Sequence, residues 1–178
     1  MTDLPRSDPL AAVSPLDGRY ARYTEPLVPY ASESALMRAR VRVEVEYLLS
    51  LADLEATPIA VDDAKRESLR DCYEGFDADD ARLIKRLETE GAAGYSATNH
   101  DVKAVEYFLR TETRKSFHPW IHFGLTSEDV NNLAHRLLLG PAVEEVLLPA
   151  LADVRDGLTT LARDYRDTPM LARTPGQP

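Results

Sequence analysis

The sequence predicts an all-α protein, with a helical amino-terminal domain followed by the first long helix of a central helical bundle. Three observations support this class: apolar residues recur every three or four positions, capping residues precede those periods, and no segment alternates as a strand would. The 178 residues are 44% hydrophobic, enough to bury a core. We expect an irregular arm over 1–33, a helical domain over 34–115, and a connector with the start of the bundle over 116–178.

Capping residues predict where the helices of the first two segments begin. Five prolines lie between positions 5 and 29, so regular helix is not expected before Ser32. Ser32 or Ser34 is a candidate cap for a first helix, and Asp62 and Asp77 begin a second and a third. A fourth should start within 98–101. The expected helices cover residues 34–54, 62–73, 77–90 and 98–114.

The most regular apolar period runs from Ser127 to about Tyr165, after a short aromatic connector over 117–124. If this stretch is one helix, Pro141 and Pro149 should bend or interrupt it. Its late steps of three and four form a heptad. The heptad residues are Leu151, Val154, Leu158, Leu161 and Tyr165. A small domain cannot cover so long a stripe, so we expect partner helices and an oligomer.

The composition argues against several classes of partner. The net charge of −9 opposes binding to nucleic acid. No apolar run approaches the roughly 20 residues that span a bilayer, and residues 1–9 lack the apolar stretch of a signal peptide. The single cysteine, Cys72, agrees with a reducing cytoplasm. We expect a cytoplasmic protein without nucleic-acid or membrane partners. A small anionic ligand would have to be held by local arginines and helix N-termini.

Arg19 and Tyr20 form the first candidate anion site. They follow a proline and an Asp-Gly turn in the run S-P-L-D-G-R-Y at 14–20, which would present both side chains from a fixed loop. The forked guanidinium suits a phosphate. The simpler interpretation is an ordinary surface turn with a solvated arginine.

The run T-N-H-D at 98–101 is the second candidate site. At a predicted helix start, unpaired backbone N–H groups and the helix dipole favour an anion, so Asn99, His100 and Asp101 are candidates to hold a phosphate. Of these, His100 can titrate near neutral pH. The alternative is that Thr98 or Asn99 caps the helix, Asp101 complements the dipole, and His100 is an incidental loop residue.

Thr126 and Ser127 form the third candidate site. The run T-S-E-D at 126–129 fits a capping box, with a hydroxyl at the cap and Asp129 three positions later. Two adjacent hydroxyls at a helix start, shortly after Gly124, could also cradle an oxyanion or a carboxylate. Capping alone would explain the same residues.

His118 and His122 have a spacing that could place two imidazoles on one helical face toward a metal. Pro119 and Gly124 argue against a helix there, and no third ligand accompanies the pair. We therefore expect packing or hydrogen bonding in the aromatic connector, and no metal site.

Three stretches form a joint pattern: S-P-L-D-G-R-Y at 14–20, T-N-H-D-V-K-A-V-E-Y-F-L at 98–109, and I-H-F-G-L-T-S-E-D-V-N-N-L at 121–133. In this order and spacing they resemble the adenylosuccinate lyase family of the fumarase/aspartase superfamily. The similarity continues through 165–174, so it covers almost the whole chain beyond the first dozen residues.

The resemblance implies a carbon–nitrogen lyase of purine biosynthesis. Such an enzyme cleaves adenylosuccinate to AMP and fumarate, and also cleaves the related succinyl-carboxamide ribotide, without metal or organic cofactor. The resemblance further implies a homotetramer whose sites draw on several chains. The positions that match substrate-contacting residues of the family are Arg19, Tyr20, Asn99, His100, Asp101, Thr126 and Ser127.

Two departures from the family pattern bear on activity. The family's R-T-H-G-Q-P motif carries a general-acid histidine, and Pro175 stands at that position here. Proline has no titratable group and cannot donate the proton. The resemblance also implies that the chain ends before the serine-bearing loop that supplies the general base. We therefore expect a fragment without appreciable lyase activity of its own.

Two other functions stay open at this stage. One is a non-catalytic helical interaction or oligomerisation module that kept the lyase scaffold, which Pro175 would permit. The other is a sister lyase or cycloisomerase of the superfamily acting on a different succinyl or fumaryl compound, although the T-N-H-D-V-K run at 98–103 argues against it. A gene that continues past codon 178 into a serine-rich loop motif would favour the lyase fragment over the module.

Overall fold

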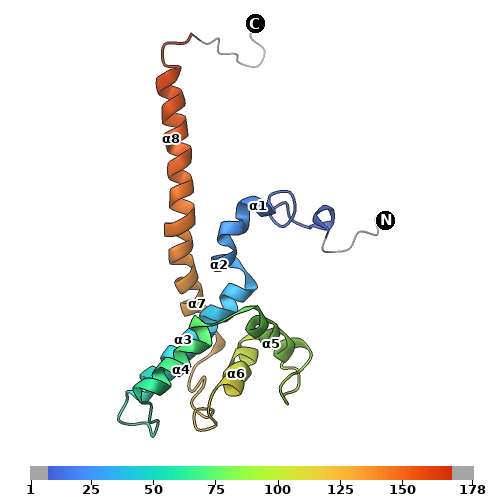
Figure 1. Ribbon diagram of the computed structural model, residues 1–178, viewed down its shortest axis with the longest axis vertical. Helices are drawn as coiled ribbons and strands as arrows, with labels where there is room; N and C mark the ends of the chain where they lie inside the picture. Colours follow the sequence, from blue (N-terminus) through green and yellow to red (C-terminus); the bar gives the residue numbers. More distant parts are fainter. Residues whose placement is uncertain (1–7, 170–178) are drawn as a thin grey trace. The chain divides into compact units, whose positions relative to one another are not determined.

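The computed structural model describes residues 8–169, and its regular elements are helices (Figure 1). In this range the extended pairing is limited to one isolated bridge, which confirms the predicted all-α class. The chain divides into two compact units, residues 1–142 and 143–178. The elements are η1 (Pro9–Ala11), α1 (Ala21–Thr24), η2 (Glu25–Leu27), α2 (Val28–Ala31), α3 (Glu33–Ala52), α4 (Asp63–Glu74), α5 (Ala78–Thr89), α6 (Asp101–Glu112), α7 (Ser127–Pro141), the π-helical η3 (Ala142–Leu147) and α8 (Leu148–Asp164).

The arm predicted to be irregular contains short helical turns. Pro26 and Pro29 lie in the first two positions of η2 and α2, where a missing N–H removes no helical hydrogen bond. The prolines therefore limit these helices to about one turn each, rather than excluding helix altogether. The turn at 14–20 is present, since the Tyr20 N–H donates to the Pro15 carbonyl at 2.8 Å.

Capping side chains begin the next three helices as predicted. The Ser32 hydroxyl accepts the Ala35 N–H at the start of α3, at 3.1 Å. Asp62 caps α4 and Asp77 caps α5, each through its carboxylate. Because a cap satisfies backbone donors that have no helical partner, these residues fix the starts of the helices.

Helix α3 is the central helix of the first unit and packs against α4, α5, α6 and α7. Its residues Val41 and Val45 are fully buried in the main core. A smaller cluster joins α3 to the starts of α6 and α7. Its buried members are Ala39, Val43, Val102, Val130 and Ala134. Because Val102 and Val130 lie in the first turns of their helices, this packing brings both helix N-termini beside α3.

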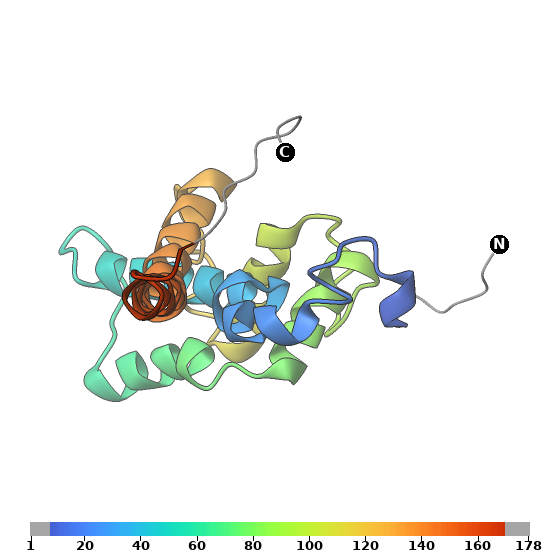
Figure 2. The same cartoon turned by 90° about the horizontal axis from the view of Figure 1, so that it is seen from above.

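The long apolar period is interrupted as predicted. Pro141 ends α7, the π-helical turn η3 follows, and Pro149 lies in the first two positions of α8. No residue of α8 is buried, and all five heptad residues are exposed. Figures 1 and 2 show α8 along its length and from its end as a single helix. Among the described residues, no helix is long and apolar enough to cross a membrane.

Candidate functional site

The N-termini of α6 and α7 meet through His100 and Ser127. The Ser127 Oγ lies 3.4 Å from the His100 Nε2. His100 is the N-cap of α6, because its Nδ1 accepts the Lys103 N–H at 3.3 Å. With Nδ1 as an acceptor, the neutral imidazole carries its proton on Nε2 and donates to Ser127. Two of the three predicted sites are therefore brought together.

His100 takes the cap position that the alternative interpretation gave to Thr98 or Asn99. The backbone of Thr98 and Asn99 is tied instead to the end of α5, by N–H bonds to the carbonyls of Leu87 at 3.0 Å and Glu88 at 2.8 Å. Asn99 adopts a φ of 50°, a left-handed conformation that asparagine tolerates better than most residues. The chain thereby turns sharply and places the imidazole of His100, rather than an asparagine or threonine side chain, at the cap.

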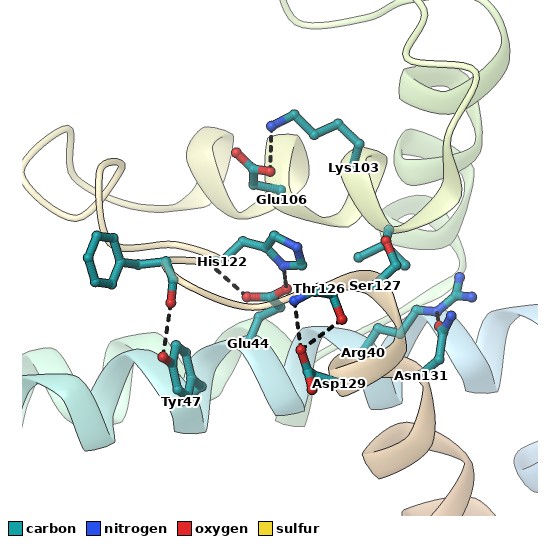
Figure 3. A network of polar contacts seen from close by, with 12 residues as sticks. Arg40, Glu44, Tyr47, Lys103, Glu106, His122, Thr126, Ser127, Asp129 and Asn131 are labelled. Atoms are coloured by element: carbon teal, nitrogen blue, oxygen red, sulfur yellow. Dashed lines mark hydrogen bonds and ion pairs between the residues drawn. The ribbon is translucent and has the colours of Figure 1, made fainter.

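Arg40 of α3 bonds to a residue at each of the two helix starts, and Figure 3 shows its bond to Asn131 of α7. Its Nη2 donates to the Asp101 carboxylate at 2.6 Å, and its Nε donates to the Asn131 Oδ1 at 2.9 Å. Arg40 is buried, with 6% of its surface exposed. Burial alone would raise the pKa of Asp101, but the Val102 N–H and the Arg40 guanidinium together hold this pKa below its usual value. Asp101 is thus an anion fixed beside the N-terminus of α6.

Thr126 caps α7, as the sequence predicts. Its N–H and its hydroxyl both donate to the Asp129 carboxylate, at 2.7 and 2.8 Å. These bonds, the backbone one first, hold the pKa of Asp129 below its usual range. Because both Thr126 donors already have this partner, the side chain of Ser127 is the more available hydroxyl at this helix start.

The connector before α7 is anchored to α3. The Tyr47 hydroxyl donates to the Phe123 carbonyl at 2.9 Å, and the Glu44 carboxylate accepts from His122 (Figure 3). His118 takes a different partner, with its Nε2 3.3 Å from the Thr113 carbonyl. Each of the two histidines of the connector thus has its own hydrogen-bonding partner, as the sequence led us to expect.

Arg19 and Tyr20 are exposed, and no described contact joins them to the paired helix starts. The Tyr20 ring contacts Tyr23, with centroids 6.4 Å apart. Within this one chain, the guanidinium and the two helix starts do not form a single cluster. The remaining position singled out by sequence, Pro175, lies outside the described residues.

Sequence reasoning missed Arg40 and Glu44, although a signal for both was present. They stand four residues apart on α3, among positions that otherwise read as the buried apolar face of that helix. A charged residue on a buried face must have a partner, because an unpaired buried charge is costly. The pattern marks such residues as structural or functional, but it does not name their partners.

Comparison with known proteins decides the family. The sequence matches the family described as Lyase over residues 18–178. The chain belongs to the lyase family. It is also 42% identical to the adenylosuccinate lyases of Legionella pneumophila (strain Corby) over 176 residues, Dictyostelium discoideum over 181 residues, and Escherichia coli (strain K12) over 177 residues. These alignments cover 95% of this chain and 37% of each relative.

The similarity to adenylosuccinate lyases predicted from the three sequence stretches is confirmed by these comparisons. The lyase chain spans 37% of the length of these relatives, so the larger part of each relative has no counterpart in these 178 residues. What the lyase chain itself contributes is the helical unit in which α6 and α7 begin side by side.

Proposed function

We propose that this chain forms part of the substrate site of an adenylosuccinate lyase. The complete enzyme would eliminate fumarate from adenylosuccinate to give AMP, and from the succinyl-carboxamide ribotide, in purine biosynthesis. The observation that carries the proposal is the contact between His100 at the start of α6 and Ser127 at the start of α7. The 42% identity to proteins named adenylosuccinate lyase supports the same conclusion.

The physical basis is the chemistry of helix N-termini. Each helix start has backbone N–H groups without helical partners, and its dipole favours negative charge. At α6 the N–H groups of Val102 and Lys103 already donate to Asp101 and His100. The dipoles of the two starts and the Ser127 hydroxyl, which accepts from the His100 Nε2–H, are therefore what suit a phosphate or a carboxylate of the substrate. Asn99, Thr126 and Ser127 would contact the ligand from the same two segments, while Asp101, held by Arg40, would receive hydrogen bonds from neutral ligand groups.

Arg19 and Tyr20 would complete the site from the arm. Since the arm makes no described contact with the helix starts of its own chain, these residues would reach the site in an assembled oligomer, a homotetramer in this proposal. A cytoplasmic location is part of the same prediction.

The 178 residues alone would release no measurable fumarate. Elimination requires protonation of the leaving nitrogen, and proton transfer of this kind typically contributes about 10²–10⁴ in rate. Pro175, at the position of the family's general-acid histidine, has no proton to give.

Kinetics of the full-length protein carrying Pro175→His test the proposal, because proline at this position leaves the leaving nitrogen without its general acid. We expect His100→Ala and Arg19→Ala each to lower kcat/KM for fumarate release by about 10²-fold or more. His135→Ala is the matched control, because His135 is an exposed histidine on α7 outside the site, and it should leave the kinetics unchanged. Unchanged kinetics in the His100 and Arg19 variants would contradict the proposed site.

A second candidate function is a helical interaction module. The exposed heptad of α8 and the proline at 175 favour it. The two functions differ in ligand binding: a module would associate through α8 and show no heat in a calorimetric titration with AMP, whereas the lyase site would bind AMP and lose this binding in His100→Ala.

A further inference from the structure

Glu44 is a carboxylate in the apolar core of the first unit. It lies on α3 between fully buried valines and has 1% of its surface exposed. Burial raises the pKa of Glu44, and hydrogen bonds from His122 oppose that rise. A carboxylate in such a place is destabilising unless donors satisfy it. Its presence on a face that apolar side chains otherwise fill calls for an explanation.

Both described hydrogen-bonding partners of Glu44 belong to His122. The His122 backbone N–H donates to Oε2 at 3.1 Å, and the ring Nδ1 lies 2.5 Å from Oε1. His122 has a φ of 61°, a left-handed conformation that few residues other than glycine adopt. The two bonds therefore hold both the backbone and the ring of His122 in one arrangement (Figure 3).

The bond to the ring decides where the His122 proton resides. Ionised Glu44 can only accept, so in that state Nδ1 carries the hydrogen of this bond. In the neutral imidazole, Nε2 is then left as an acceptor, the same relation in which a carboxylate orients a catalytic or metal-binding histidine. His122 stands four residues before Thr126, the cap of α7. The bonds between Glu44 and His122 therefore also help to position the start of α7.

We propose that Glu44 is a positioning residue for the substrate site: through His122 it fixes the connector before α7 and the protonation of that imidazole at Nδ1. This inference deepens the proposed function and rests on it for the kinetic consequence. The position of the proton on His122 is independent of any reaction, so the two claims can fail separately.

Nitrogen-15 NMR of the histidine rings in the full-length protein provides the direct test. The His122 signals are assigned by their loss in His122→Gln. In the wild type, Nδ1 of His122 should carry a proton. Glu44→Gln keeps an acceptor oxygen and should keep that proton at Nδ1, whereas Glu44→Met has no such acceptor and should release it to Nε2. A wild-type His122 protonated at Nε2 alone would overturn the proposal, even if Glu44→Met did not fold.

Glu106→Met is the matched control. Glu106 is also a buried carboxylate of the first unit, 3% exposed, but its partners are Lys103 at 2.6 Å and Arg110 at 2.5 Å. The Glu106→Met variant should be less stable than the wild type, but its His122 should stay protonated at Nδ1. If Glu106→Met shifted the His122 proton as much as Glu44→Met does, the effect would be general loosening of the core and the inference would be wrong.

Kinetics then link the position of His122 to the site. Misplacement of a site by about 1 Å can cost about 10²-fold in rate, so we expect Glu44→Met to lower kcat/KM for fumarate release on that order. Glu44→Gln should recover most of the loss. Equal kinetics with and without Glu44→Met in the Pro175→His protein would contradict a positioning function. Absence of fumarate release from the full-length protein carrying Pro175→His would refute the proposed function, while the NMR result would still decide the arrangement at His122.

Discussion

Single buried charges hold the candidate site together, and Arg40 does so for three helices. Replacing Arg40 with Met keeps the aliphatic stem and removes the bonds to Asp101 and Asn131. Because each hydrogen bond to a charged group contributes about 1.5–3 kcal/mol and two are lost, we expect the free energy of unfolding to fall by roughly 3 kcal/mol or more. Chemical denaturation measures it. Arg82→Met removes an exposed pair with Asp79 and should cost at most about 1 kcal/mol. Equal losses would show that Arg40 is no more than a surface charge.

The same residues mark the limit of prediction from sequence. Arg40 contacts Asp101 and Asn131, which lie 61 and 91 positions further along the chain, and Glu44 contacts His122 across 78 positions. The local sequence pattern shows that a charged residue on a buried helix face needs a partner. Which distant residue becomes that partner depends on how the helices pack. His100 was a candidate ligand from sequence, yet its function as a cap was missed because serine, threonine, aspartate and asparagine are the usual caps.

At the scale of elements, helix starts were predictable wherever the cap is local. Ser32, Asp62, Asp77 and Thr126 each lie beside the apolar period that they begin, so both signals indicated the same boundary. The short helices of the arm were not foreseen, since proline was taken to exclude helix rather than to start it. The interruption near Pro141 was predicted, whereas its form as a π-helical turn was not, because proline removes one N–H without dictating what replaces the bond.

The connection from α5 to α6 supports a prediction on two glycines. Gly91 and Gly94 both have left-handed φ values, 88° and 85°. A Cβ on Gly91 would lie 2.8 Å from the Tyr95 carbonyl oxygen, whereas one on Gly94 would meet nothing within 4 Å. We expect Gly94→Ala to cost about 1–2 kcal/mol from backbone strain alone, and Gly91→Ala to cost more because backbone must also move. Thermal unfolding measures the stability of both variants. A smaller loss of stability in Gly91→Ala than in Gly94→Ala would contradict the close approach of a Cβ at position 91 to the Tyr95 carbonyl oxygen.

At the scale of the whole molecule, the two units differ in whether they can bury their apolar residues. The first unit has two core clusters around α3, and these clusters hold the site residues of α6 and α7 in place. In the second unit no residue of α8 is buried, although its apolar heptad residues form a stripe from Leu151 to Tyr165 in four steps of three or four residues. A lone helix of 17 residues is marginally stable in water. Most helical stability in proteins comes from packing of an apolar face, so we expect other helices to cover the stripe of α8.

Covering helices from other copies would make assembly depend on single residues of the stripe. Leu158 is 61% exposed in this chain, and burying a leucine contributes about 1.5–3 kcal/mol at each equivalent contact. We expect Leu158→Glu to lower the mass of the assembly that the full-length protein forms, as measured by sedimentation velocity. The melting temperature of this variant should also depend less on protein concentration than that of the wild type. Thr160→Glu adds the same charge to an exposed position outside the stripe and should leave the mass unchanged. If both variants kept the wild-type mass, the stripe of α8 would not be an interface between copies. A carboxylate buried in such an interface would weaken the association measurably.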